Sequence, residues 1–435
     1  MKTQRYASDA ASPVGSILVA ISLTAAFLAS PLMAVSVAGA QEMNLPSGVT
    51  ERVAPESDAL GTKLGGFTAY PKLGVSTGYN SNLYAADNDE KSSGVFMIDP
   101  SLAFDSNWSR NKLSFGGFLS QALHNDRSQE DNTNWGVGGS GQLDVLEDSN
   151  IKSSLGYERL TERRGGINAN LAIPDPIQYE LFQWGLLGNH RINKLTLSAA
   201  VDFDSFDYSP TSGQIQDYRN RDLWVFTGQG GYEFSPGYSG FVRGVFNDRS
   251  FENRSVTTGA APGVGLQQDS QGYEITAGIS SEITNLISGE AYIGYLDQDY
   301  QAGGFDDVSG VSFGLDLVWE ATQMTTVRLT ASRDVADATV PGTGGIFYSV
   351  GGFGVDHELM PSVFLKGDFS YYNANYEGSS DDREDDGYRA SVGADYRFSR
   401  ILHLDLLYTF DERDSNVAGQ DYTGHQVTFG VRLQH

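Results

Sequence analysis

The sequence predicts an all-β protein, a transmembrane antiparallel up-and-down β-barrel of about 18 strands, with about 16 to 18 as the range. Three observations support this fold class. Segments of about ten to fourteen residues, longer than the usual strand, alternate apolar and polar side chains. Short polar corners alternate with longer loops along the chain. After residue 40, no stretch of about eighteen consecutive apolar residues could form a membrane helix, so any crossing would use strands.

The clearest hairpin runs from Gly94 to His124. In its first arm, Phe96 and Ile98 lie on one face of a period-two ribbon, while Asp99 and Asp105 lie on the other. A polar corner follows, and the second arm repeats the pattern. One face suits hydrocarbon and the other suits water, which is the pattern of a barrel wall.

The first forty residues, 1–40, have the layout of a cleavable signal peptide. Lys2 and Arg5 precede the mainly apolar Val14–Val37, and Ala38-Gly39-Ala40 offers small residues for cleavage. An uncleaved anchor is the alternative. The chain has no cysteine, so we expect an exported protein that does not depend on disulfides.

The mature chain divides into two parts. Residues 41–66 show no clear periodicity and carry Pro46 and Pro55. We expect them to form a periplasmic N-terminal arm or a plug segment in the barrel mouth. Residues 67–435 are expected to form the outer-membrane β-barrel.

The remaining strands follow the same period-two pattern as the hairpin. The first precedes it, and fifteen more complete a count of eighteen. They are Tyr70–Tyr84, Thr133–Val145, Ile151–Arg163, Phe182–Asn189, Leu195–Phe203, Leu223–Phe234, Tyr238–Phe251, Gly272–Ile283, Ile287–Tyr300, Val311–Trp319, Val327–Ala331, Ile346–Leu359, Val363–Tyr371, Tyr388–Phe398, Leu402–Phe410 and Tyr422–Leu433.

The connections between these strands differ in length. Corners such as Asn193-Lys194 and Ser235-Pro236-Gly237 are short, whereas Arg164–Gln178 and Asn253–Asp269 are long. The alternation predicts short periplasmic turns and longer extracellular loops. A soluble sandwich or propeller would also alternate, but each arm here has only one apolar face, which lipid can cover and water cannot.

The polar face of the strands carries charges of both signs, with acid in excess. Eighteen strands leave a lumen too wide for side chains to fill. These charges either pair with one another or line a hydrated path. The predicted pore-lining residues are Asp99, Asp105, Lys112, Asp202, Asp204, Asp316, Arg328, Lys366, Asp368, Asp395, Arg397 and Asp405, and Asp144, Glu290 and Arg432 share their face.

The formal net charge of −26 disfavours nucleic acid as a partner. The acidic runs Ala86–Lys91 and Ser379–Asp386 are interpreted as solvated loops, with a surface that binds divalent cations or bridges lipopolysaccharide as the alternative. The expected partners are outer-membrane lipid and lipopolysaccharide, together with the barrel-assembly machinery.

The sequence shows no enzyme motif. The six histidines are isolated, and no HExxH, GxSxG, Walker or CxxC pattern occurs. We therefore predict no enzyme activity, no catalytic residues, no cofactor and no metal site. A site assembled from distant strands, or a metal site in the acidic runs, remains the alternative.

An ordered set of short motifs then indicates a family. It comprises Arg52-Val53-Ala54-Pro55-Glu56, Ala59-Leu60-Gly61, Gly65-Gly66-Phe67, Tyr70-Pro71, Tyr79-Asn80-Ser81-Asn82-Leu83, Asp99-Pro100-Ser101-Leu102 and Ser106-Asn107-Trp108-Ser109-Arg110. In their order these motifs resemble the start of a family of bacterial outer-membrane β-barrel porins. Members often belong to exopolysaccharide or capsule biosynthesis and secretion systems. The chain departs from many outer-membrane barrels by ending in Leu433-Gln434-His435 instead of an aromatic residue.

The resemblance implies a porin-like protein that takes part in exopolysaccharide export across the outer membrane, with polysaccharide and periplasmic export components as partners. The acidic inner face favours the alternative, a general or cation-preferring diffusion porin for small hydrophilic solutes. A barrel enzyme or adhesin is a third hypothesis.

Overall fold

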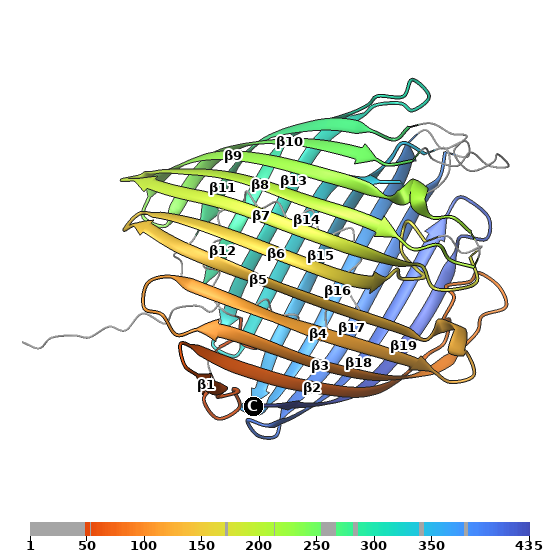
Figure 1. The fold of residues 1–435 in the computed structure, drawn as a ribbon, viewed down its shortest axis with the longest axis horizontal. Coiled ribbons are helices and arrows are strands. Elements are labelled where there is room, and N and C mark those ends of the chain that lie inside the picture. The colour runs from red at the N-terminus through yellow and green to blue at the C-terminus, as the bar shows by residue number, and fades with distance from the viewer. Residues whose placement is uncertain are drawn as a thin grey trace, which may run out of the picture.

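The computed structural model describes residues 48–52, 54–169, 173–212, 214–253, 267–281, 286–338, 343–377 and 382–435. The predicted signal peptide and residues 41–47 lie outside the described residues. Eighteen long strands, β2 to β19, form one closed antiparallel barrel (Figure 1). This confirms the predicted fold class and strand number. The short strand β1, Thr62–Leu64, pairs with β2 and is not counted among the eighteen barrel strands.

The barrel strands are 12 to 16 residues long, and two 3-10 turns lie between them. The bounds are β2 Phe67–Asn80, β3 Ser93–Ser106, β4 Lys112–His124, β5 Asn132–Leu146, β6 Ser149–Thr161, β7 Gln178–Ile192, β8 Leu195–Tyr208, β9 Arg221–Ser235, β10 Tyr238–Phe251, β11 Ser270–Ser281, β12 Ile287–Tyr300, β13 Val308–Thr322, β14 Thr325–Asp337, β15 Gly345–Met360, β16 Val363–Glu377, β17 Glu384–Arg397, β18 Leu402–Ser415 and β19 Tyr422–Gln434, with η2 Ser128–Glu130 and η3 Asp217–Arg219.

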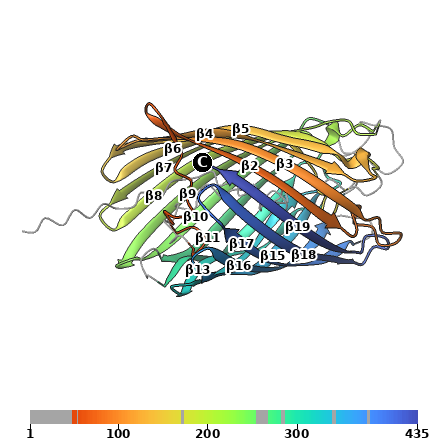
Figure 2. The ribbon, with the colours of Figure 1, turned by 90° about the horizontal axis from the view of Figure 1, so that it is seen from below.

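The barrel closes where the last strand pairs with the first. In the β19–β2 register, Val431 lies opposite Val75 and Phe429 lies opposite Thr77. Every other barrel strand pairs with its two sequence neighbours. Figure 2 shows β2 and β19 side by side on one flank of the barrel. Closure leaves no free sheet edge, so the backbone groups of the wall are satisfied by the ladder.

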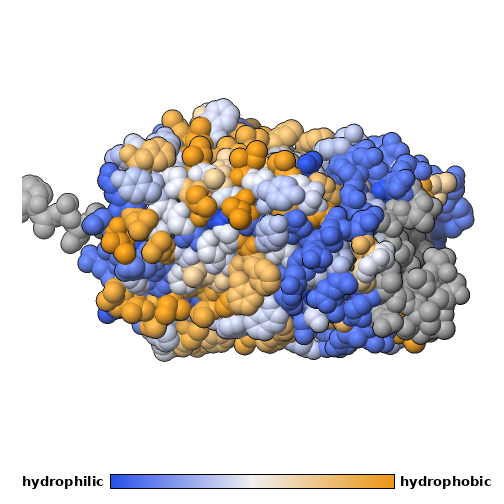
Figure 3. Space-filling model, turned by 90° about the horizontal axis from the view of Figure 1, so that it is seen from above, coloured by the Kyte–Doolittle hydropathy of each residue, from blue (hydrophilic) through white to orange (hydrophobic). Residues whose placement is uncertain are grey.

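Strand alternation gives the barrel an apolar outer face. Ile293 is 64% exposed, Ile279 61% and Val392 60%, and each alternates with polar residues that face inward. Figure 3 shows this apolar surface as an orange band, with a hydrophilic zone toward the end that carries the long loops. Because about 9 to 11 residues suffice to cross a bilayer, the strands extend beyond the apolar band.

The two ends of the barrel differ as the sequence predicts. The connections between β7 and β8 and between β9 and β10 are tight, whereas the segments between β6 and β7 and between β8 and β9 are long. We call these the short-turn end and the long-loop end. Both the N-terminal arm and the C-terminus lie at the short-turn end (Figure 1).

Some predicted strand bounds agree closely with the structure, whereas other strands were predicted too short, as with Val327–Ala331, which is only part of β14. Strands β10 and β12 have the predicted limits. The first strand was predicted too late, because β2 runs from Phe67 to Asn80 and not from Tyr70 to Tyr84. Ser81 to Tyr84 leave the strand where the Asn80 side chain accepts a hydrogen bond from the Asn82 backbone. Among the described residues, no helix is long and apolar enough to span a membrane.

Candidate functional site: the lumen of the barrel

The twelve residues predicted to line a pore share one face of the wall. Strand alternation puts each of them opposite the exposed apolar side chains of its own strand. They do not form one cluster. Asp99, Asp105, Lys112, Asp202 and Asp204 lie on β3, β4 and β8, and Asp316 lies on β13. Arg328, Lys366, Asp368, Asp395, Arg397 and Asp405 lie on β14, β16, β17 and β18.

The inner face of β3–β8, which we call the acidic wall, carries carboxylates with neutral partners. The Ser120 hydroxyl donates to Asp99 at 2.5 Å, and the Gln183 amide donates to Asp204 at 3.1 Å. The Oδ2 atom of Asp202 is buried and has no hydrogen-bond partner among the described residues. A hydroxyl or amide donor does not cancel the charge of a carboxylate as an arginine would, and Lys112 and Lys152 lie on the same face of this wall.

The other residues of this wall lie nearer the short-turn end. The Ser114 hydroxyl donates to Asp105 at 2.7 Å. Lys112 begins β4 and lies opposite Gln142 in the register with β5. A second amide, from Gln142, donates to Asp144 at 2.7 Å. Neutral hydroxyl and amide donors therefore recur at both ends of this wall.

The inner face of β14–β19, which we call the paired wall, carries both signs of charge. The Arg328 guanidinium lies 2.6 Å from Asp356. Arg397 and Arg432 lie 3.6 and 3.8 Å from the same oxygen of Asp395. Here the carboxylates have cationic neighbours, so their charges cancel locally.

The remaining predicted residues also lie on or near the paired wall. Lys366 faces Asp356 across the β15–β16 register, and the Ser391 hydroxyl lies 3.4 Å from Asp368. The Asp405 carboxylate covers Gly430 on β19, where a side chain would collide with it. Asp316 lies on β13 opposite Glu290, whose own partner is Arg243 at 3.0 Å.

The N-terminal arm, residues 48–61, lies against the short-turn end of the wall, inside the barrel. The Val49 amide donates to Thr326 at 2.8 Å, and Arg397 donates to the Thr50 carbonyl at 2.6 Å. The Ser57 carbonyl accepts from His403 and from Gln434. These contacts run from β14 to β19, so the arm covers the paired wall at this mouth.

Between β6 and β7 the described residues are 162–169 and 173–177, which we call the crossing loop. They reach across the lumen at the long-loop end. Ile167 is 5% exposed and packs with Ile346, Ala374 and Tyr376, which belong to β15 and β16 on the far side of the barrel. The Tyr376 hydroxyl donates to the Ile167 carbonyl at 2.6 Å. The loop is therefore fixed to the paired wall by both apolar and polar contacts.

The crossing loop is also fixed near its own strands. Ile173 packs with Tyr179, Phe206 and Tyr208 of β7 and β8. At the start of the loop, Glu162 pairs with Arg219 at 2.7 Å. Burial alone would lower the pKa of Arg219, but the neighbouring Tyr208 and Glu162 outweigh burial and raise it. Arg219 thus stays charged and holds the loop to the β8–β9 connection.

Sequence reasoning missed the crossing loop because alternation reports only which face a strand residue occupies. The stretch was predicted as a long external loop. The available signal was its four branched apolar residues, Ile167, Leu171, Ile173 and Ile177, in a segment otherwise rich in polar residues, glycine and proline. Apolar residues in such a loop need a surface to cover them, and here the lumen supplies it.

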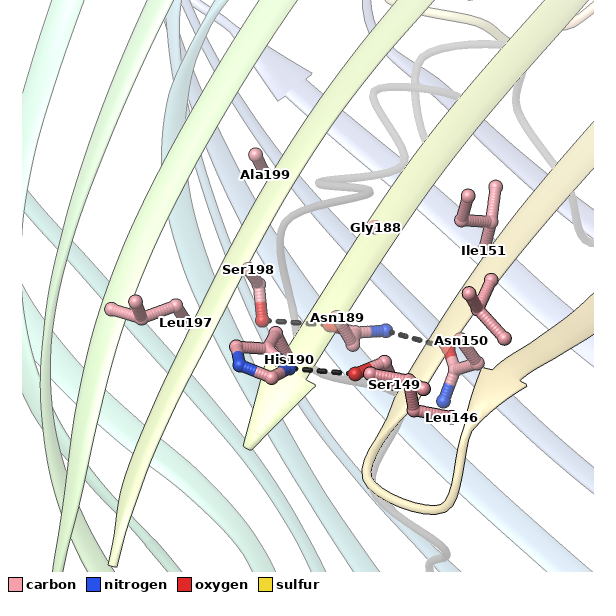
Figure 4. Close-up of a pocket in the computed structure, with 11 residues that line it drawn as sticks. Leu146, Ser149, Asn150, Ile151, Gly188, Asn189, His190, Leu197, Ser198 and Ala199 are labelled. Carbon is pink, nitrogen blue, oxygen red and sulfur yellow. Dashed lines mark hydrogen bonds between the residues drawn. The ribbon is translucent and has the colours of Figure 1, made fainter. Parts of the chain in front are cut away.

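A separate hollow lies on the outside of the wall. It has a volume of about 440 Å³ and is lined by Ile151, Gly188 and Leu197 among others, near the short-turn end of β6–β8 (Figure 4). At its edge the Ser149 hydroxyl lies 2.6 Å from His190 Nδ1. Because alternation puts these residues on the outer face, this hollow does not belong to the lumen.

The N-terminal arm and the crossing loop both lie against the inner face of the barrel, and comparison with known proteins gives the class of the barrel. The family model described as "Putative beta-barrel porin 2" matches residues 54–435. The chain belongs to this porin family. It is therefore a porin-like outer-membrane β-barrel. None of the curated proteins matches this sequence.

Several solved structures are similar to this chain at low identity. OpdO of Pseudomonas aeruginosa is 14% identical, with 85% of this chain and 97% of that chain covered and a TM-score of 0.44. OccAB4 of Acinetobacter baumannii is 10% identical, with 84% and 98% covered and a TM-score of 0.45. OpdK of Pseudomonas aeruginosa is 12% identical, with 84% and 99% covered and a TM-score of 0.43. No substrate of this porin follows from these similarities.

Proposed function

We propose that this porin is a diffusion channel for small hydrophilic solutes that prefers cations. The observation that carries the proposal is the placement of the N-terminal arm and the crossing loop. The N-terminal arm contacts β13–β19, and the crossing loop reaches β14–β19. The contacts described for the arm thus leave the short-turn half of the acidic wall uncovered.

The solute path therefore runs along the carboxylates of the acidic wall. Asp99, Asp202 and Asp204 have neutral partners or none among the described residues. In a lumen with low-dielectric walls, such charges raise the local concentration of cations and lower that of anions. The predicted pore-lining residues of the paired wall contribute less, because their charges are balanced by ion pairs.

The N-terminal arm and the crossing loop also set the size limit of the channel. An unobstructed 18-stranded barrel would leave a wide aqueous lumen. The crossing loop spans from β6–β7 to β15–β16, and the arm narrows the opposite mouth. We therefore propose that small solutes pass and that the short-turn end, with the arm, faces the periplasm.

A part in exopolysaccharide export is the second candidate function. It is supported by the motifs of residues 52–110 and by half-buried Tyr348 and Tyr372, whose rings lie 5.7 Å apart on the inner face. Aromatic rings on an inner wall offer apolar surface to sugar rings. Polysaccharide and periplasmic export components would then be partners, and a polymer would require the crossing loop and the arm to move aside.

One experiment separates the two functions. The purified protein is inserted into planar bilayers, and single-channel conductance and reversal potential are measured in a salt gradient. The proposal predicts open channels with a cation-selective reversal potential, and a barrel that conducts no ions would contradict it. In parallel, a gene deletion is assayed for secreted polysaccharide and for small-solute uptake. Loss of secretion with normal uptake would favour the second candidate.

A further inference from the structure

We infer that the inner wall beneath the crossing loop holds an oxyanion-binding site, suited to a carboxylate or a phosphate group. The site is built on β16, β17 and β18 from Tyr372, Arg389, Arg413 and Asp411, with Arg163 supplied by the crossing loop. The inference is independent of the proposed channel function, because the site would bind its ligand even if the protein conducted no ions.

The register places these side chains together. Tyr372 lies opposite Gly387, and Gly387 lies opposite Arg413. In the next inward row, Arg389 lies between Ser370 and Asp411. Gly387 has no side chain, and the ring of Tyr372 covers its position, where a Cβ atom would collide with the ring. Tyr372, Arg389 and Arg413 therefore surround one small area of the wall.

Three donors in this area lack an acceptor. The Tyr372 hydroxyl, the Arg389 Nε and the Arg413 Nη2 are all buried, and none has a hydrogen-bond partner among the described residues. Buried donors without a partner cost free energy, most of all when they are charged. Three of them in adjacent inward rows indicate that an acceptor group completes the site.

The local charge is positive in balance, in contrast to the acidic chain. Arg163 and Arg389 both contact Asp411, and Arg413 lies two residues along the same strand from Asp411, on the same face. One oxygen of Asp411, Oδ2, is already shared by three donors, because it accepts from Arg389 at 2.8 Å, from the Tyr422 hydroxyl at 3.0 Å and from Arg163. The nearby Asp385 is engaged by Arg383 and Tyr376. The positive excess is left for an anion.

The chemistry of the donors defines the ligand class. Guanidinium N–H groups and a tyrosine hydroxyl bind oxygen acceptors, and guanidinium groups match the planar carboxylate and the phosphate in particular. Access runs past Arg163, whose side chain is 31% exposed, and past half-buried Tyr348. The ligand is thus either a free inorganic anion or a solute that carries the acidic group.

The test uses the full mature protein in detergent, with calorimetric titration of sodium glucuronate, inorganic phosphate and neutral glucose. We expect binding of one or both oxyanions and none of glucose. The variant Tyr372→Phe removes only the unpartnered hydroxyl, and Arg389→Gln removes an unpartnered Nε. Each should weaken binding by about tenfold, since a hydrogen bond to a charged group is worth that much.

Matched controls keep the result interpretable. Tyr348→Phe removes a neighbouring inward hydroxyl, and Arg432→Gln removes an inward guanidinium at the other mouth; both should leave the affinity unchanged. Competition by glucuronate for the phosphate site would identify an acidic solute, whereas phosphate binding alone would identify a free anion. Absence of oxyanion binding by the folded wild type, or equal affinity in Tyr372→Phe and the controls, would overturn the inference.

Discussion

The acidic wall and the paired wall are made of the same strand pattern but hold their charges differently. On the acidic wall, Asp99 and Asp204 accept from a hydroxyl and an amide. On the paired wall, Asp356 accepts from Arg328 at 2.6 Å, and Asp395 forms an ion pair with Arg397 at 3.6 Å. The N-terminal arm contacts the paired wall, and the crossing loop contacts the paired wall with Ile167 and the strands β7 and β8 with Ile173. We propose that the ion pairs of the paired wall help to position these two segments, while the carboxylates of the acidic wall face the solute path.

The largest expected effect is on ion selectivity. Replacing Asp99 and Asp202 by asparagine on the acidic wall should lower the cation-to-anion permeability ratio by about threefold or more, because their charge is focused on the path. Replacing Asp356 and Asp395 on the paired wall removes the same formal charge and should change the ratio less. Reversal potentials in a salt gradient measure the cation-to-anion permeability ratio of each double variant. An equal change of this ratio in the two double variants would contradict the difference between the two walls.

The next effect concerns the crossing loop. Ile167→Ala removes its apolar contact with the paired wall, and Ile173→Ala removes a contact with its own side of the barrel. Each costs about 2 to 5 kcal/mol of packing free energy, but only Ile167→Ala should free the tip of the loop. We expect larger and noisier single-channel currents for Ile167→Ala alone. Identical currents in both variants would show that the loop does not narrow the path.

A smaller effect is expected at the other mouth. Deleting residues 48–58 should raise conductance by up to about twofold, because the barrel is wide without the arm. The matched control replaces the same residues by a glycine–serine segment of equal length, which keeps the chain but removes contacts such as that of Val49 with Thr326. Both variants should conduct more than wild type, and unchanged conductance would mean that the arm lies outside the solute path.

The smallest effect is expected for Arg52→Gln. The Arg52–Glu320 pair joins the arm to β13, and its side chains are 34% and 20% exposed. Such a solvated pair contributes about 0 to 1 kcal/mol, so thermal stability and conductance should stay close to wild type. A marked rise in conductance would show that this single pair holds the arm in place.

The strands of the barrel wall could be predicted from the sequence, but the segments that lie inside the barrel could not. Period-two alternation fixes the face of each strand residue, so β10 and β12 have their predicted limits and the charged residues share one face. Alternation carries no information on contacts between distant segments. The pair Arg163–Asp411 joins residues far apart in the chain, and the packing of Ile167 on β15 and β16 depends on barrel closure. These contacts follow from tertiary structure alone.

The central claim is that the polar face of the wall surrounds water and the apolar face meets lipid. The chain has no cysteine, so Asp202→Cys and Phe203→Cys, adjacent on β8, can be compared in bilayers with a cationic, membrane-impermeant thiol reagent. We expect the cysteine at position 202 to react and to lower the single-channel conductance, while the one at position 203 stays unmodified. Reaction at position 203 with protection at position 202 would contradict this placement of water and lipid.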